Sequence, residues 1–258
     1  MNSDHPSQSP HLEEIYALID KNRVAAARAA QAKFHNDIEA AITTIVSIGT
    51  IAGARVQADS RIASAKVLIN AELAATRLLA EAEVQASKCV KAAMTKPKDV
   101  VKAALMEIGK QTSLQLVANA KESVGKIEND AEAAIKILRE TGAIAIREVQ
   151  AMAANVAEKT KRDAELAAEK LKEHRKRVGT PAEAAFEGED VAKIVIKAAE
   201  EASVTLQEAL KATLANINAV TDAACAAVHE AALAAEKKIA EGLERALARL
   251  QETLKSHS

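Results

Sequence analysis

The chain has 258 residues, with 35 Lys and Arg against 36 Asp and Glu and a formal net charge of −1. Alanine supplies 60 residues, whereas Trp is absent and only one Tyr and two Phe occur. So few aromatic side chains exclude an ordinary compact core, which depends on aromatic burial, and argue against a β-sheet protein. Balanced charge argues against a general nucleic-acid-binding protein, which needs excess Lys and Arg to meet phosphate.

The ends of the chain and its cysteines indicate where it resides. Residues 1–8 are polar, lack the basic and apolar segments of a secretion signal, and are expected to be a disordered tail. We expect residues 9–258 to form a single elongated helical-rod domain. Two cysteines are too few for a disulfide framework, so we expect a cytoplasmic protein, with signal-free export left open. The sequence has no uninterrupted run of about 18 apolar residues, so we expect no membrane-spanning helix.

Three breaks divide the chain into long helical stretches. Ser9-Pro10 suits a helix start, and Pro97 separates two further stretches. The run Gly179-Thr180-Pro181 combines a residue suited to end a helix with a cap and a first-turn proline. These breaks predict helices over about 10–95, 97–178 and 181–256.

Apolar residues recur every eleven positions along each stretch. The first stretch has two such columns, and the second and third stretches have one each, interrupted only by Thr160. Eleven residues in three turns keep an apolar stripe nearly straight along a helix, so we expect the columns to line the seams between helices. The columns are Ile51, Ile62, Leu73 and Val84; Val56, Val67, Leu78 and Cys89; Leu116, Ile127, Leu138, Val149, Thr160 and Leu171; and Val195, Leu206, Ile217, Val228, Ile239 and Leu250.

These patterns predict an all-α fold of long Ala-rich helices with eleven-residue repeats. Short connections favour antiparallel neighbours, so we expect an up-down-up three-helix rod, a helical bundle of coiled-coil type. Phe34 falls one eleven-residue step before Ile45 and is expected in the core. Cys89 and Cys225 lie in apolar or small-residue surroundings and are expected to be buried structural thiols.

Two stretches with few charges are candidates for self-association. No charged residue lies between Glu39 and Arg55, and Asp222 is the single charge in 214–228. A helix that is apolar all round is normally buried all round. The predicted self-association interface consists of Ile42, Ile45, Ile48, Gly49, Ile51, Gly53, Ile217, Val220 and Ala224.

Two other interpretations of the first stretch remain open. Its hydroxyl residues would simply form the solvent face, or the stretch would make shallow contact with a membrane, being too short to span one. The hydroxyl residues concerned are Thr43, Thr44, Ser47 and Thr50.

The sequence predicts no catalytic residue, cofactor, metal site or small-molecule substrate. No HExxH, Gly-rich phosphate loop, GxSxG or zinc-type Cys/His spacing occurs. No Glu stands three residues before His35, His174 or His229, so the di-iron helical motif is missing as well. We therefore expect a protein that is not an enzyme.

The resulting hypothesis is a structural protein: a self-associating Ala-rich helical rod that forms a homo-oligomer, filament or sheath, with itself as partner and no nucleic acid. The alternative is an amphipathic coat protein on a lipid or polymer granule. The eleven-residue period resembles that of exchangeable apolipoproteins and synucleins, and the composition resembles that of phasins, without a motif match. An ice-binding or desiccation-protective helix is a third hypothesis, weakened because the threonines keep no eleven-residue column.

Overall fold

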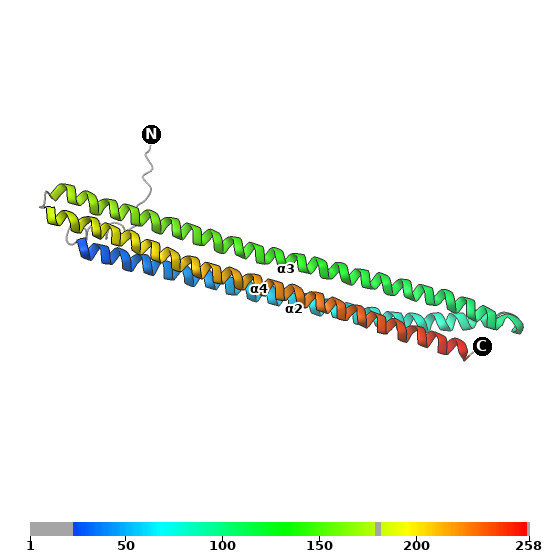
Figure 1. The fold of residues 1–258 in the computed structure, drawn as a ribbon. Helices are drawn as coiled ribbons and strands as arrows, with labels where there is room; N and C mark the ends of the chain where they lie inside the picture. The colour runs from blue at the N-terminus through cyan, green and yellow to red at the C-terminus, as the bar shows by residue number, and fades with distance from the viewer. Residues whose placement is uncertain (1–22, 179–181, 257–258) are drawn as a thin grey trace, which may run out of the picture. The chain divides into compact units, whose positions relative to one another are not determined.

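The computed structural model describes residues 23–178 and 182–256 and contains three long helices over that part of the chain (Figure 1). Helix α2 spans Arg23–Met94, α3 spans Lys98–Val178 and α4 spans Ala182–Lys255. Their lengths are 72, 81 and 74 residues. The described residues contain no strand, so the all-α prediction is confirmed for them.

The observed bounds agree with the predicted helices wherever both can be compared. Helix α2 ends at Met94, and Lys96 N–H donates to the Ala93 carbonyl at 3.0 Å in a final tight turn. Pro97 then offers its carbonyl to the N–H of Val100 at 3.0 Å at the start of α3. The predicted tail, the first turns from residue 10 and the break at 179–181 lie outside the described residues.

Alanine explains both the length of the helices and the spacing between them. It has the highest intrinsic helix propensity, and its methyl group lets neighbouring backbones come close. An added Cβ at Gly242 of α4 would lie 2.9 Å from the Ala75 Cα of α2. The two backbones therefore nearly touch there, closer than the usual separation of packed helices allows.

The chain divides into two compact units, and each helix contributes to both. Unit 1 takes in the described residues up to Gly53 together with Ala143–Asn218, and unit 2 comprises Ala54–Gly142 with Ala219–Ser258. In unit 1 the three helices enclose one apolar core in which α2 and α4 meet where Gly49 faces Thr213. Its largest fully buried side chains are Phe34, Ile38, Ile45, Leu171, Leu206 and Ile217.

Unit 2 shows an up-down-up topology through its contacts. Helices α2 and α3 are antiparallel, because Lys66 meets Asp130 while Glu81 meets Asn119. Helices α3 and α4 are antiparallel as well, with Gly109 near Leu254 and Gly142 near Thr221. Helices α2 and α4 are parallel: their contacts are Ser60–Ala224, Glu72–Lys238 and Glu83–Arg249.

The core of unit 2 is built from side chains at eleven-residue intervals. Its buried bulky residues are Val56, Val67 and Leu78 of α2, Leu116, Ile127 and Leu138 of α3, and Val228, Ile239 and Leu250 of α4, with alanines between them. Few interior groups are polar. Ser60, 4% exposed, donates its hydroxyl to the Ala224 carbonyl at 2.9 Å and so links α2 to α4.

The predictions for Phe34 and the two cysteines are confirmed. Phe34 is 1% exposed in unit 1. Cys89 and Cys225 are free thiols, 2% and 7% exposed, in unit 2. Cys89 Sγ lies 3.7 Å from the Thr112 hydroxyl, and Cys225 Sγ lies 3.9 Å from the Ile135 carbonyl oxygen. Both thiols therefore serve as small core side chains.

Candidate functional site

The nine residues predicted for self-association do not form one surface. Five of them are buried: Ile45, Gly49 and Gly53 in α2, and Ile217 and Ala224 in α4. Ile45 and Ile217 pack in the core of unit 1, and Ala224 packs in the core of unit 2. The bundle itself covers these five residues, so only the other four of the predicted residues are accessible to a second chain.

The four remaining residues are partly or fully accessible. Ile42, Ile48 and Val220 are partly buried against the cores, and Ile51 is 67% exposed. The four hydroxyl residues of the same stretch are exposed, and three of them donate to the carbonyl four residues before. They form part of the solvent face, as the interpretation that assigned the hydroxyl residues to solvent predicted.

The unexpected feature lies on the outer face of α2. Of the two apolar columns in that helix, the one running through Val56, Val67 and Leu78 is buried, as expected. The other column is exposed: Ile62 is 67% exposed, Leu73 is 47% exposed and Val84 is 52% exposed. Corresponding residues of the two columns are five positions apart in the sequence. Their side chains therefore point in directions more than a third of a turn apart around the helix axis.

The exposed column belongs to a wider uncharged stripe within unit 2. Residues spaced by three, four and four positions share this face, and each of them is exposed and uncharged. We name this set the outer stripe of α2. It consists of Ala54, Ala58, Ile62, Ala65, Ile69, Leu73, Thr76, Ala80, Val84 and Ser87.

Charged residues border the outer stripe on both edges. One edge carries the exposed Arg55, Lys66, Arg77 and Lys88, each four residues after a member of the exposed column. This basic column could have located the outer face from the sequence alone. Residues four positions apart are separated by one full turn plus about a tenth of a turn, so they lie on nearly the same side of the helix. The other edge carries Arg61, Glu72 and Glu83.

Some of these border residues are held by the bundle itself. Glu72 pairs with Lys238, and Glu83 pairs with Arg249 at 3.7 Å, both across to α4. Arg61 and Arg77 have no ion pair with any residue that the structure describes. Their guanidinium groups are available to a second molecule.

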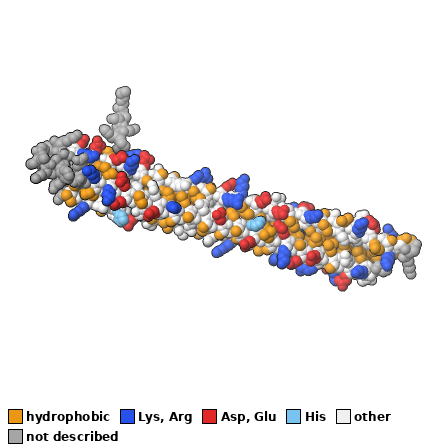
Figure 2. Space-filling model, in the orientation of Figure 1, with side chains coloured by type: hydrophobic (Ala, Val, Ile, Leu, Met, Phe, Trp, Pro, Cys, Tyr) orange, Lys and Arg blue, Asp and Glu red, His pale blue; other side chains and the backbone are white. Residues whose placement is uncertain are grey.

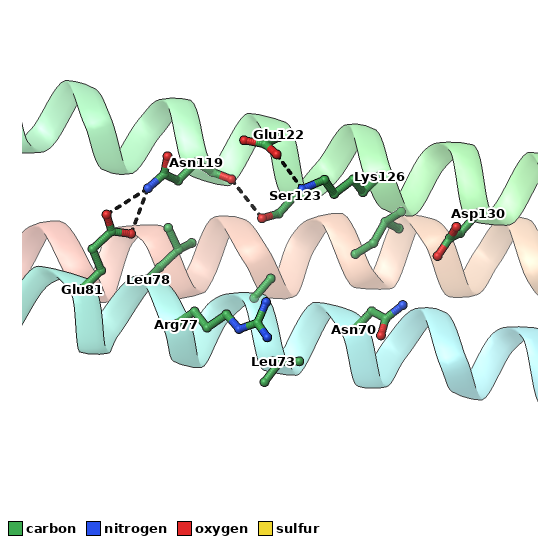
Figure 3. Close-up of a pocket in the computed structure, with 12 residues that line it drawn as sticks. Asn70, Leu73, Arg77, Leu78, Glu81, Asn119, Glu122, Ser123, Lys126 and Asp130 are labelled. Atoms are coloured by element: carbon green, nitrogen blue, oxygen red, sulfur yellow. Dashed lines mark hydrogen bonds and ion pairs between the residues drawn. The ribbon is translucent and has the colours of Figure 1, made fainter.

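None of three surface grooves among the described residues gathers a nucleophile beside a base. The groove between α2 and α3 in unit 2 has a volume of about 440 Å³ and opens to solvent (Figure 3). Asn119 Nδ2 donates to both oxygens of Glu81, at 3.0 and 2.8 Å, and thereby joins the two walls. On the α3 wall the Lys126 ammonium binds the Glu122 carboxylate and lowers its pKa below the usual value. The Glu122 carboxylate is thus neutralised by Lys126, and the Glu81 carboxylate is held by an amide.

The other two grooves are similar in kind. One in unit 1, of about 540 Å³, is lined by residues of α2 and α4 that include Arg28, His35 and Glu201. One in unit 2, of about 520 Å³, lies between α3 and α4 near Leu254. No group of three or more His, Cys, Asp or Glu suited to a metal ion occurs within the described ranges.

Apolar side chains also reach the surface away from the grooves, as at Ile62 and Ile69. Figure 2 shows hydrophobic side chains that reach the surface among Lys, Arg, Asp and Glu on the face in view. Helix α2 also contains an 18-residue window with mean hydropathy 1.3, long and apolar enough to cross a membrane by length and composition. Only 28% of that window is buried.

Comparison with known proteins identifies the fold alone. No protein-family model and no curated protein matches the sequence. A solved structure described as a computationally designed three-helix bundle matches with a TM-score of 0.57 and 16% sequence identity, over 94% of this chain and 99% of that chain. The chain is therefore similar to a three-helix bundle across most of its length.

Proposed function

We propose that this chain is a non-enzymatic structural protein that associates with further copies of itself through the outer stripe of α2. The observation that carries the proposal is the exposure of Ile62, Ile69, Leu73 and Val84 on one uncharged face. A contiguous apolar face on a soluble bundle is typical of an interaction surface.

The geometry of the outer stripe favours a helical partner. Its spacing of three, four and four residues keeps the stripe nearly straight along α2. Six of its ten members are Ala, Thr or Ser. Small side chains let two helix backbones approach closely. A closed pair would give a homo-oligomer, whereas a second, different contact would extend the assembly into a filament or sheath.

Light scattering coupled to size exclusion tests this proposal. The wild-type chain is expected to show a mass that rises from one chain to a multiple of 27.2 kDa as its concentration increases. Leu73→Glu places a charge in the outer stripe and is expected to weaken association by at least about tenfold, because a buried unpaired carboxylate is strongly unfavourable.

Leu114→Glu on α3 is the matched control. Leu114 is 63% exposed and lies outside the outer stripe, so its substitution should leave the mass distribution unchanged. A wild-type chain that remains monomeric at every concentration would refute the proposed self-association.

A coat on a lipid or polymer granule is the second candidate function. The apolar window of α2, only 28% buried, favours it. Interfacial helices usually carry bulky or aromatic residues on the face that enters the lipid, whereas the outer stripe has no aromatic residue. Flotation with vesicles or polymer granules tests this function: a coat protein rises with the particles, and a self-associating bundle stays in the soluble fraction.

A further inference from the structure

We infer that the outer stripe of α2 binds the same stripe of a second copy in antiparallel orientation, with Ile62 against the partner's Leu73. This inference rests on the proposed self-association and specifies its geometry. The occupant is another copy of this chain because apolar residues of the stripe and several of its bordering charges find complementary residues on a second copy in this arrangement.

The apolar residues match in this register. When the stripe is laid antiparallel on itself, Ile62 meets the partner's Leu73, and the twofold axis repeats the same contact. Ala65 then lies beside the partner's Ile69, so that a small residue faces a large one. Alternation of small and large side chains is what close packing of two helices requires.

Two arginines on the basic edge lie near carboxylates of the partner in the same register. Identical edges face each other across an antiparallel helix pair related by a twofold axis. Arg77 then lies within about two residues of the partner's Asp59, and Arg55 within about two residues of the partner's Glu81. Without the partner, Asp59 has only a 4.0 Å contact with Arg55, and Arg77 has no ion pair among the described residues.

The opposite edge gives a further match. Arg61 lies within about two residues of the partner's Glu72, and the axis generates this pair twice. A parallel pair with its helices level would set the basic column against Glu72 and Glu83, which already pair with Lys238 and Arg249, and against Arg61. The antiparallel arrangement instead gives a carboxylate to each of the two border guanidinium groups without an ion pair among the described residues, Arg61 and Arg77.

An anionic lipid surface fits the same face less well. Glu72 and Glu83 stand on one edge, and Asp59 and Glu81 lie just beyond the basic column on the other. Carboxylates on both sides would be repelled by anionic headgroups, whereas membrane-surface helices concentrate Lys and Arg on their polar face. Binding to vesicles is accordingly an outcome that would overturn the inference.

A charge exchange in the full-length chain tests the pairing. Arg77→Glu sets two acidic side chains opposite each other, and Asp59→Arg sets two basic ones. Each single variant is expected to raise the dissociation constant of the dimer by about tenfold, since the axis doubles the effect. The double variant should bring the constant back to within about threefold of wild type. Arg139→Glu, an exposed position on α3, is the control and should have no effect.

Cross-linking tests the direction and register independently. Ile62→Cys and Leu73→Cys replace exposed side chains, whereas the native thiols are buried. A mixture of the two variants should form an interchain disulfide under mild oxidation. Ile62→Cys alone should not, because eleven residues place its two copies about 16 Å apart along the helices, beyond the reach of a disulfide.

The outcomes separate this inference from the proposed function. A dimer that cross-links through Ile62→Cys alone would support self-association but overturn the antiparallel register. The same holds if neither charge variant changes the dissociation constant of the dimer. A chain that is monomeric at every concentration would refute both. A monomer that floats with vesicles of neutral and anionic phospholipid would refute both as well and support the coat function.

Discussion

The glycines of α3 and α4 differ in what a methyl group would meet. A Cβ added at Gly125 has nothing within 4 Å, whereas a Cβ added at Gly242 would stand 2.6 Å from the Ala75 Cβ and 2.9 Å from its Cα. Both glycines lie inside helices, where Gly costs about 0.5–1 kcal/mol relative to Ala. Local backbone entropy therefore favours alanine at both positions, and packing opposes it at only one.

We predict opposite effects for the two alanine substitutions. Gly125→Ala should raise the free energy of unfolding by about 0.5–1 kcal/mol, because it restricts the unfolded chain without a clash. Gly242→Ala should lower it by about 1–3 kcal/mol, because α2 and α4 must separate. Urea denaturation followed by circular dichroism measures both, and equal signs would contradict the close approach of the two backbones.

At the scale of the element, α2 shows how one helix carries two different apolar faces. Ile45 is fully buried in the core of unit 1, whereas Ile51 is 67% exposed six residues later. Both residues belong to the same charge-free stretch, and composition gave no reason to separate them. The neighbouring helices decide which of them is structural.

This contrast gives a second prediction. Ile45→Asn should lower the free energy of unfolding by about 3 kcal/mol or more, because it adds a buried amide and removes apolar packing. Ile51→Asn should change it by no more than about 0.5 kcal/mol, as expected for an exposed position. Thermal melts of both variants check the difference. Similar losses would mean that Ile51 is covered in the folded chain.

For the whole molecule, the proposed self-association would couple stability to protein concentration. A partner that binds only the folded chain stabilises it by mass action. We therefore predict that the melting temperature of the wild-type chain rises as protein concentration increases. For Leu73→Glu it should stay nearly constant over the same range. Differential scanning calorimetry at several concentrations provides the test, and a wild-type value independent of concentration would argue against a folded-state oligomer.

Sequence patterns predicted the fold more fully than the candidate surface. Pro97 placed the end of one helix and the start of the next within about three residues of their observed positions at Met94 and Lys98, because proline cannot continue a helix interior. The column through Leu206 and Ile239 predicted a buried face, and both residues are 1% exposed. The candidate surface included Ile45 and Ile217, which the chain itself buries, because absence of charge does not distinguish a residue covered by its own chain from one that is exposed.

The sequence by itself determined three long helices, their breaks and the angular positions of their apolar faces, since helix propensity and periodicity are local properties. Only the tertiary structure decided which of the two apolar columns of α2 is covered. Periodicity fixes the angle between the columns, but the positions of α3 and α4 around α2 select the one through Val56 and leave the one through Ile62 exposed. That choice depends on contacts between residues far apart in the chain, such as Ser60 with Ala224.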